Sequence, residues 1–266
     1  MSGEDRYEEI EPPEALKPFV RVIWTYVAPA PSGAVQRIAP DGCPELVFES
    51  GEPYEELCPD GAWRTQPNIV FAGQLTRPLA LRPTGPVDLI AVRFQPDGAR
   101  GFLGRPLAEA TDRALDASDL IPAGLTWDVP SILDWLQTAA RAWTLDPVVR
   151  AEVEAAAAAE PGAARNSAER RALQRAFHDR VGVPPQTLRS VFRFRRVFNN
   201  AAQVADPEAG AWLRAGLDAG YFDQPQMARD FRRFLGCTAT EWAREQVELA
   251  RLMASQSYKP GDTVPA

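Results

Sequence analysis

The feature that most constrains this chain is a change of hydrophobic periodicity near residue 130. Before it, β-branched and aromatic runs are bounded by clusters of Pro, Gly and Asp, which is typical of strands; they lie at 19–27, 45–50, 68–73 and 89–95. After it, apolar residues recur at helical spacing. The sequence therefore predicts an α+β protein, in which a mostly β half is followed by an all-α half.

The first half has the turns and the closing helix that a small β domain needs. The stretches PDGCP at 40–44 and PTGP at 83–86 are typical of tight turns. The stretch PDGARGFLG at 96–104 predicts a short helix that closes the sheet. These features fit a sandwich or a small barrel with little helix, and they leave the strand order open.

Residues 129–160 are predicted to form a helical connector. An apolar stripe along its first helix suits either core packing or a dimer seam, and it consists of Ile132, Leu136, Ala139 or Ala140, and Trp143. An alanine-rich helix at 150–159 then ends at Pro161 and Gly162. We place the boundaries at 1–128, 129–160 and 161–250, and we expect a disordered tail at 251–266.

Cysteine and histidine usage limits the chemistry. Cys43, Cys58 and Cys237 are far apart and form no CxxC pair, and His178 is the single histidine, which argues against a Cys/His zinc site. We predict no metal and no cofactor. The thiols are structural or incidental, or Cys43 and Cys58 form a redox-sensing pair.

No segment indicates export or membrane insertion. Residues 1–13 are acidic and lack the apolar core of a signal peptide, and the apolar runs are too short to cross a bilayer. The sequence predicts a cytoplasmic protein with no membrane partner.

The charge is segregated along the chain. The formal net charge is −7, yet residues 165–233 contain thirteen Arg, no Lys and seven Asp or Glu, a net charge of +6 that leaves −13 for the rest. An acidic partner for the second half is therefore plausible, although the whole chain is acidic.

Residues 220–234, GYFDQPQMARDFRRF, predict a turn followed by an amphipathic helix. Gly220 suits a left-handed turn after a preceding helix with Trp212, Ala215, Gly216 and Ala219 on its inner face, Asp223 is a good N-cap, and Pro225 fits the first turn. The buried stripe is Met227, Phe231, Phe234 and Leu235. The outer face carries Gln226, Arg229, Arg232 and Arg233, so this unit is typical of a helix-turn-helix.

A second unit lies upstream, at 166–185. Ser167 is the predicted N-cap, and the predicted buried stripe is Leu173, Phe177 and Val181. Arg171, Gln174, Arg175 and His178 point outward. The helix that follows would act as a rod that sets the two units on successive faces of a major groove, about 34 Å apart.

These motifs resemble those of a known family. The stretch GYFDQPQMARDFRRFLGCT closely resembles the second-half signature of the AraC/XylS transcription regulators, and LQRAF with GVPPQTLRSVFRFRRVF resembles the first half of their DNA-binding domain. APDGCPELVF and VRFQPDGARGFLGRPLAE resemble the β domain of one branch of these regulators. EPGAARNS is about eight residues too short for the usual helix before the first unit, so the alanine-rich helix would have to replace it.

The resemblance implies a double helix-turn-helix that binds double-stranded DNA. The predicted DNA-binding residues are Arg171, Gln174, Arg175, Gln224, Gln226, Arg229, Arg232 and Arg233. Amide and guanidinium groups match base edges, so Gln226 and Arg229 are expected on bases. Arg232 and Arg233 are expected on phosphates, with Ser167 and Arg193 or Arg196 doing so elsewhere. The alternative is that these arginines form a solvated face with no role in binding.

The family resemblance implies a sensor or dimerisation role for the β half. Its aromatics, Trp24, Tyr26, Phe48, Trp63 and Phe71, are expected mainly in the core, with a minority lining an effector pocket anchored by Asp41, Glu45 or Arg93. Cys43 lacks a histidine neighbour that would activate it, and we predict no enzyme.

We therefore predict a sequence-specific transcription regulator that takes a small-molecule effector or forms a homodimer, and that contacts RNA polymerase if it is an activator. The alternative is a ligand- or protein-binding module whose degenerate first unit no longer reads operators alone.

Overall fold

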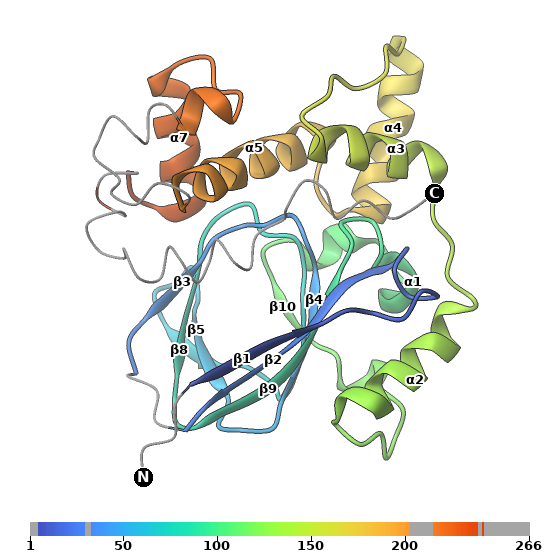
Figure 1. Ribbon diagram of the computed structural model, residues 1–266, viewed down its shortest axis with the longest axis vertical. Coiled ribbons are helices and arrows are strands. Elements are labelled where there is room, and N and C mark those ends of the chain that lie inside the picture. The colour runs from blue at the N-terminus through green and yellow to red at the C-terminus, as the bar shows by residue number, and fades with distance from the viewer. Residues whose placement is uncertain (1–4, 30–32, 203–214, 239–240, 242–266) are drawn as a thin grey trace.

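The computed structural model of the protein describes residues 5–29, 33–202, 215–238 and 241. A β half lies at one end, and helices lie across the other end (Figure 1). The predicted α+β class is confirmed. No helix in this described part of the chain has the length and apolar content to cross a membrane. Trp212 and the predicted tail at 251–266 lie outside the described residues.

Two antiparallel sheets make up the β half. The larger sheet has the order β1 (Arg6–Ile10), β2 (Val20–Ala28), β9 (Val87–Phe94), β4 (Glu45–Glu49), β7 (Ile69–Ala72) and β10 (Ala114–Asp116). The smaller sheet has the order β3 (Gln36–Ile38), β8 (Leu79–Pro83), β5 (Tyr54–Leu57) and β6 (Trp63–Thr65). The runs predicted as strands became β2, β4, β7 and β9, which are the four central neighbours of the larger sheet.

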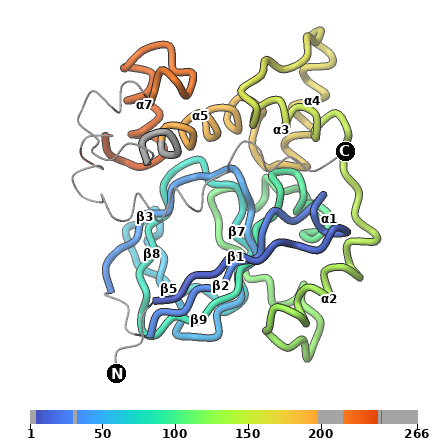
Figure 2. The backbone as a smooth tube through the Cα atoms, in the orientation of Figure 1, coloured from blue at the N-terminus to red at the C-terminus, as the bar shows by residue number. Residues whose placement is uncertain are grey.

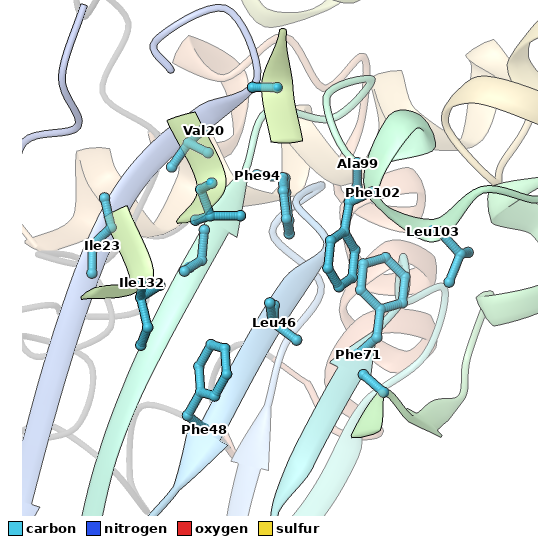
Figure 3. Close-up of a cluster of buried hydrophobic side chains, with 14 of the residues drawn as sticks. Val20, Ile23, Leu46, Phe48, Phe71, Phe94, Ala99, Phe102, Leu103 and Ile132 are labelled. Atoms are coloured by element: carbon cyan, nitrogen blue, oxygen red, sulfur yellow. The ribbon is translucent and has the colours of Figure 1, made fainter. Parts of the chain in front are cut away.

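The outer face of the larger sheet carries the main core. It is covered by α1 (Arg100–Leu103), a 3₁₀ turn at Leu107–Ala110 and α2 (Val129–Ala140); a second 3₁₀ turn lies at Ser118–Leu120. Figure 3 shows Phe102 beside the sheet residues Phe94 and Phe71, and Ile132 of α2 near Ile23 on the same face. The stripe of α2 is buried in this core, so the core interpretation of that helix is confirmed.

The helical half consists of α3 (Pro147–Ala157), α4 (Ser167–Arg180), α5 (Pro185–Ala202) and α7 (Gln224–Leu235), and residues 215–218 are also helical. The helices α3, α4 and α5 share one apolar cluster, and α7 shares another with Val191, Phe194 and Val197 of α5. Thus α5 belongs to both clusters and, with 18 residues, is about 27 Å long.

The two halves meet along α5 and the end of α4. Arg100 of α1 forms an ion pair with Asp179 of α4, with Nε and Oδ1 2.9 Å apart. Gly42, in the predicted turn at 40–44, has a φ of 87° and lies so close to Phe192 that a Cβ would approach the ring to 2.6 Å. Figure 2 shows α5 running across this end of the β half. The turn therefore requires glycine for both its conformation and its packing.

Candidate functional site

The helix α7 is built by local signals. Gly220 has a φ of 89°, and the side chain of Asp223 caps the helix by accepting a hydrogen bond from the backbone N–H of Gln226 at 2.7 Å. Gly236 ends the helix in the left-handed conformation. The predicted turn and N-cap are therefore confirmed, and they fix where α7 begins.

One face of α7 is locked against α5. The predicted stripe is buried and consists of Met227, Phe231, Phe234 and Leu235. The rings of Phe231 and Phe234 both have their centres 5.1 Å from that of Phe194 on α5. Burial of such rings fixes the rotation of α7 about its own axis, and this decides which residues face outward.

The opposite face of α7 is open. Gln224, Arg229, Arg232 and Arg233 are exposed, as predicted. Gln226 is half-buried, and its Oε1 accepts a hydrogen bond from the backbone N–H of Phe222 at 3.0 Å, so it also holds the turn.

Sequence reasoning missed Phe222 on this surface. Its side chain is 90% exposed beside the N-terminus of α7. An aromatic residue between the turn glycine and the N-cap is the signal that could have identified it.

A charged network joins α7 to α5 and corrects one prediction. Arg193 pairs with Asp230 of α7 at 2.9 Å and lies 4.6 Å above the ring of Tyr221, whose hydroxyl donates to the same carboxylate at 3.0 Å. Burial and the charge of Asp230 raise the pKa of Tyr221. Arg196 donates to the carbonyl of Ala157 at 3.2 Å. Arg193 and Arg196, predicted on phosphates, are therefore used inside the protein.

The helix α4 also has a buried and an open face. Its N-cap is Asn166, which forms a capping box with Glu169; the predicted cap Ser167 is instead the first helical residue. Asparagine outranks or equals serine at this position, and its side chain accepts from two backbone N–H groups. The buried stripe is as predicted, and Arg171, Gln174, Arg175 and His178 are exposed.

The approach to α4 differs from a helix-turn-helix. The segment 158–166 that joins α3 to α4 is longer than the turn of a helix-turn-helix, which has roughly three or four residues. Glu152 of α3 is buried and pairs with both Arg165 and Arg189, and although burial opposes ionisation, these two arginines lower its pKa. The helix α3 therefore replaces the missing helix in packing, but at the end of a longer connection.

A cavity of about 270 Å³ lies inside the β half, between the two sheets. Residues of β4 alternate between the faces of the sheet, so Glu45, Val47 and Glu49 line the cavity while Leu46 and Phe48 join the outer core. Its aromatic lining consists of Tyr7, Trp24, Tyr26 and Tyr54. Of the predicted aromatics, Phe48 and Phe71 are core, and Trp63 stacks under Arg82 at 4.3 Å.

The predicted polar anchors meet at the end of the cavity nearest α5. Arg93 Nε lies 2.7 Å from Glu45 Oε1 and 3.4 Å from Asp41 Oδ2, and Trp24 donates to Glu45 at 3.1 Å. Burial alone would lower the pKa of Arg93, but the two carboxylates outweigh it and raise that pKa. Asp41, Glu45 and Arg93 are thus brought together as expected of a pocket floor.

Sequence reasoning missed Arg195. This side chain comes from α5, lines the cavity and is 5% exposed. Burial lowers its pKa to about 10, so it remains charged at neutral pH. The residues just before it, Phe194 and Arg193, hold α7. These three consecutive residues of α5 therefore link the cavity, through Arg195, to α7, through Arg193 and Phe194.

The buried thiol of Cys43 lacks the features of a reactive cysteine. Cys43 and Cys58 form no disulfide, and burial raises the pKa of Cys43 to about 12, which opposes thiolate formation. Among the described residues, no group of three His, Cys, Asp or Glu side chains could hold a metal ion.

A family model described as a domain of unknown function, DUF6597, matches residues 8–116. No curated protein matches the sequence. Among solved structures, the chain is similar to ToxT from Vibrio cholerae, with 8% identity, a TM-score of 0.40 and coverage of 90% of this chain and 97% of that one.

The chain is also similar to the AraC-like transcriptional activator CuxR, with 11% identity, a TM-score of 0.28 and coverage of 94% of this chain and 96% of that one. A third similar structure is the Cupin_2 domain of an XRE family transcriptional regulator from Enterobacter cloacae, with 24% identity, a TM-score of 0.26 and coverage of 34% and 96%. These neighbours include members of the AraC family, which the motifs of the helical half resemble.

Proposed function

We propose that the protein is a transcription regulator that binds duplex DNA through α7, with α4 as a second contact, and that holds a small effector in the β half. The observation that carries this proposal is the surface of α7. Its apolar face is locked by Phe231 and Phe234, and its other face presents an amide and three guanidinium groups to solvent. Because packing fixes the direction in which this polar face points, the helix is suited to enter the major groove of DNA.

The residues of α7 divide by their chemistry. Gln226 and Arg229 lie toward its N-terminal half, where their amide and guanidinium groups can match adenine and guanine edges. Arg232 and Arg233, in the last turn, neutralise phosphates. Phe222, beside the N-terminus, supplies an exposed ring for a thymine methyl group or a sugar.

The path from effector to DNA runs through α5. Arg195 lines the cavity, while Arg193 and Phe194 hold α7. A ligand that contacts Arg195 better in one position of α5 than in another shifts the population toward that position. Since α7 is fixed to the same turn of α5, its placement on DNA follows. Self-association of the β half and contact with RNA polymerase belong to the same proposal.

In vitro selection of DNA sequences with the full chain, followed by titration of the selected duplex, tests this function. Arg229→Ala should lose about 1–3 kcal/mol of binding and relax specificity. Arg233→Ala should weaken all sequences alike and reduce the salt slope by about one. Arg64→Ala, which removes an exposed arginine of the β half, is the control and should bind as the unaltered chain does. If both α7 variants bind like this control, the DNA-binding role is rejected.

A second function is favoured by the long connection before α4. If the first unit cannot read DNA, the protein is a ligand- or protein-binding module that no longer selects operators alone. Selection then yields salt-sensitive binding without a defined motif. A defined motif with two half-sites one helical turn apart would instead support reading by both units.

A further inference from the structure

The two ends of the cavity differ in their balance of charge. At the end nearest α5, Asp41 and Glu45 face Arg93 and Arg195, so two acidic groups are balanced by two basic groups. Farther along β4, Glu49 is the remaining charged side chain among the described residues that line the cavity. Glu49 lies four positions after Glu45 along the strand, a rise of about 13 Å. The cavity therefore has one balanced end and one acidic end.

Glu49 is buried, and its carboxyl group is incompletely satisfied. The residue is 4% exposed, and within the described part of the chain its Oε1 accepts no hydrogen bond. Burial raises the pKa of Glu49 to about 7, and the charge of Asp88 adds to this; the backbone N–H groups of Asp88 and Gly51 offset only part of it. A buried acceptor without a partner costs free energy, so it indicates a group that binds there.

Two tyrosine rings lie at this acidic end. Tyr54 lies close enough to Glu49 and Tyr26 for their charges to raise its pKa, in addition to the larger effect of burial. Tyr7 and Trp24, with ring centres 5.8 Å apart, line the cavity farther toward Glu45, to which Trp24 donates a hydrogen bond. Faces of aromatic rings attract organic cations, and a carboxylate among them adds a direct ionic contact.

We propose that the cavity binds a small organic monocation, an amine with an apolar body, whose ammonium group contacts Glu49 among the rings of Tyr26 and Tyr54. The apolar body lies along Val47, Leu81 and Leu89. An anion would instead meet the one unbalanced carboxylate of the cavity. The volume of about 270 Å³ limits the ligand to a small molecule. This inference names the effector class of the proposed function and rests on it.

Calorimetric titration of the full chain with three probes of equal length tests the proposal. The probes are hexylamine, hexanol and hexanoate. Hexylamine should bind at least tenfold more tightly than either of the others. Glu49→Gln, which keeps the shape of the side chain and removes its charge, should weaken hexylamine at least tenfold and leave hexanol unchanged. Glu52→Gln, at an exposed acidic residue nearby, is the matched control and should bind hexylamine normally.

Three results would overturn the proposal: hexanoate binds most tightly, hexylamine fails to bind the unaltered chain, or Glu49→Gln binds hexylamine as the control does. Thermal unfolding of each variant without ligand shows that it is folded. Because glutamine needs no ionisation in the apolar wall, the Glu49→Gln variant should fold.

The pH dependence gives a second readout. Hexylamine should bind more weakly as the pH is lowered through about 7, since the protonated carboxyl group of Glu49 has no charge to offer. Among the described residues, Asp88 from β9, Tyr54 from β5 and Tyr26 from β2 are the other titratable groups at this end of the cavity. If the loss of hexylamine affinity below about pH 7 persists in Glu49→Gln, one of these other groups causes it. Glu49 is then rejected as the contact.

The same preparations are then titrated with the selected duplex. Operator binding without hexylamine binding would reject this inference and leave the regulator function standing. Hexylamine binding that depends on Glu49, without operator binding, would support the cation site and reject the regulator function.

Discussion

The same strands of the larger sheet contribute side chains to two faces that serve different purposes. In β4, Leu46 and Phe48 face outward and are fully buried in the main core. Their neighbours Glu45, Val47 and Glu49 face the cavity. Strand geometry forces this alternation, so one five-residue strand contributes to two environments that differ in polarity and packing.

The difference shows where stability and function are placed. The outer face is apolar and filled by α1 and α2, which is what a folded core requires. The inner face leaves empty space and carries charged groups that lose hydration on burial. Residues kept at such a cost are expected to serve binding, and changes to them should affect stability less, or even raise it.

The largest effect is expected on the outer face, from Phe94→Ala. The ring of Phe94 is fully buried, with its centre 5.6 Å from Phe102 and 6.3 Å from both Phe71 and Trp143. Its removal should lower the free energy of unfolding by about 3–5 kcal/mol because the surrounding rings cannot close the space. Urea unfolding measures this. If Phe94→Ala loses less free energy of unfolding than an inner-face variant does, the proposed difference between the two faces is wrong.

On the inner face, Arg93→Met should have the next largest effect. It leaves Asp41 and Glu45 without their shared cation. Loss of one partner of a buried pair costs about 3–5 kcal/mol. Asp41 and Glu45 retain side-chain exposures of 20% and 21%, so we expect about 2–3 kcal/mol.

A second substitution sharpens this test. Adding Glu45→Gln to Arg93→Met removes one of the stranded charges and should recover part of the lost stability. If the double variant is less stable than Arg93→Met, repulsion between stranded carboxylates is not the cause of the loss.

Glu49→Gln should stabilise the protein, in contrast to the first two. The folded-state pKa of about 7 lies above the ordinary value of 4.5, so the folded state holds the proton more strongly than the unfolded state. Stability conferred by the protonated form is present below about 4.5 and lost as the pH rises through about 7. The variant should match the unaltered chain at pH ~4 and exceed it by about 1–3 kcal/mol at pH ~8. Equal stability at both pH values would contradict burial as the cause.

The same two faces explain how much could be predicted from the sequence. The central strands were found because they are rich in β-branched and aromatic residues. The strands β1, RYEEI, and β5, YEEL, were missed because few of their residues join the core. Glu45 and Arg93 were predicted as polar anchors of a pocket. Glu49 was missed because it ends its strand, where a charged residue is typical of a solvated edge.

In the helical half, short-range signals were the reliable ones. Gly220 and Asp223 act within a few residues, and both were placed correctly. Arg195 was missed because α5 carries several arginines, and which of them faces inward depends on how the helix docks on the β half. Ser167 was misplaced by one residue because Asn166 competes for the same role. The sequence therefore could not predict which side chains are buried by contacts between the two halves.

The smallest effect is expected from Val47→Ala, compared with Leu46→Ala on the same strand. Leu46 is fully buried in the outer core, and its truncation should cost about 2–5 kcal/mol. Val47 already borders empty space, so part of its side chain has no packing partner to lose. Val47→Ala should cost less than about 1 kcal/mol, measured by the same urea unfolding. If both variants lose the same free energy, the cavity is filled or collapsed in solution, and the contrast between the two faces is not one of packing.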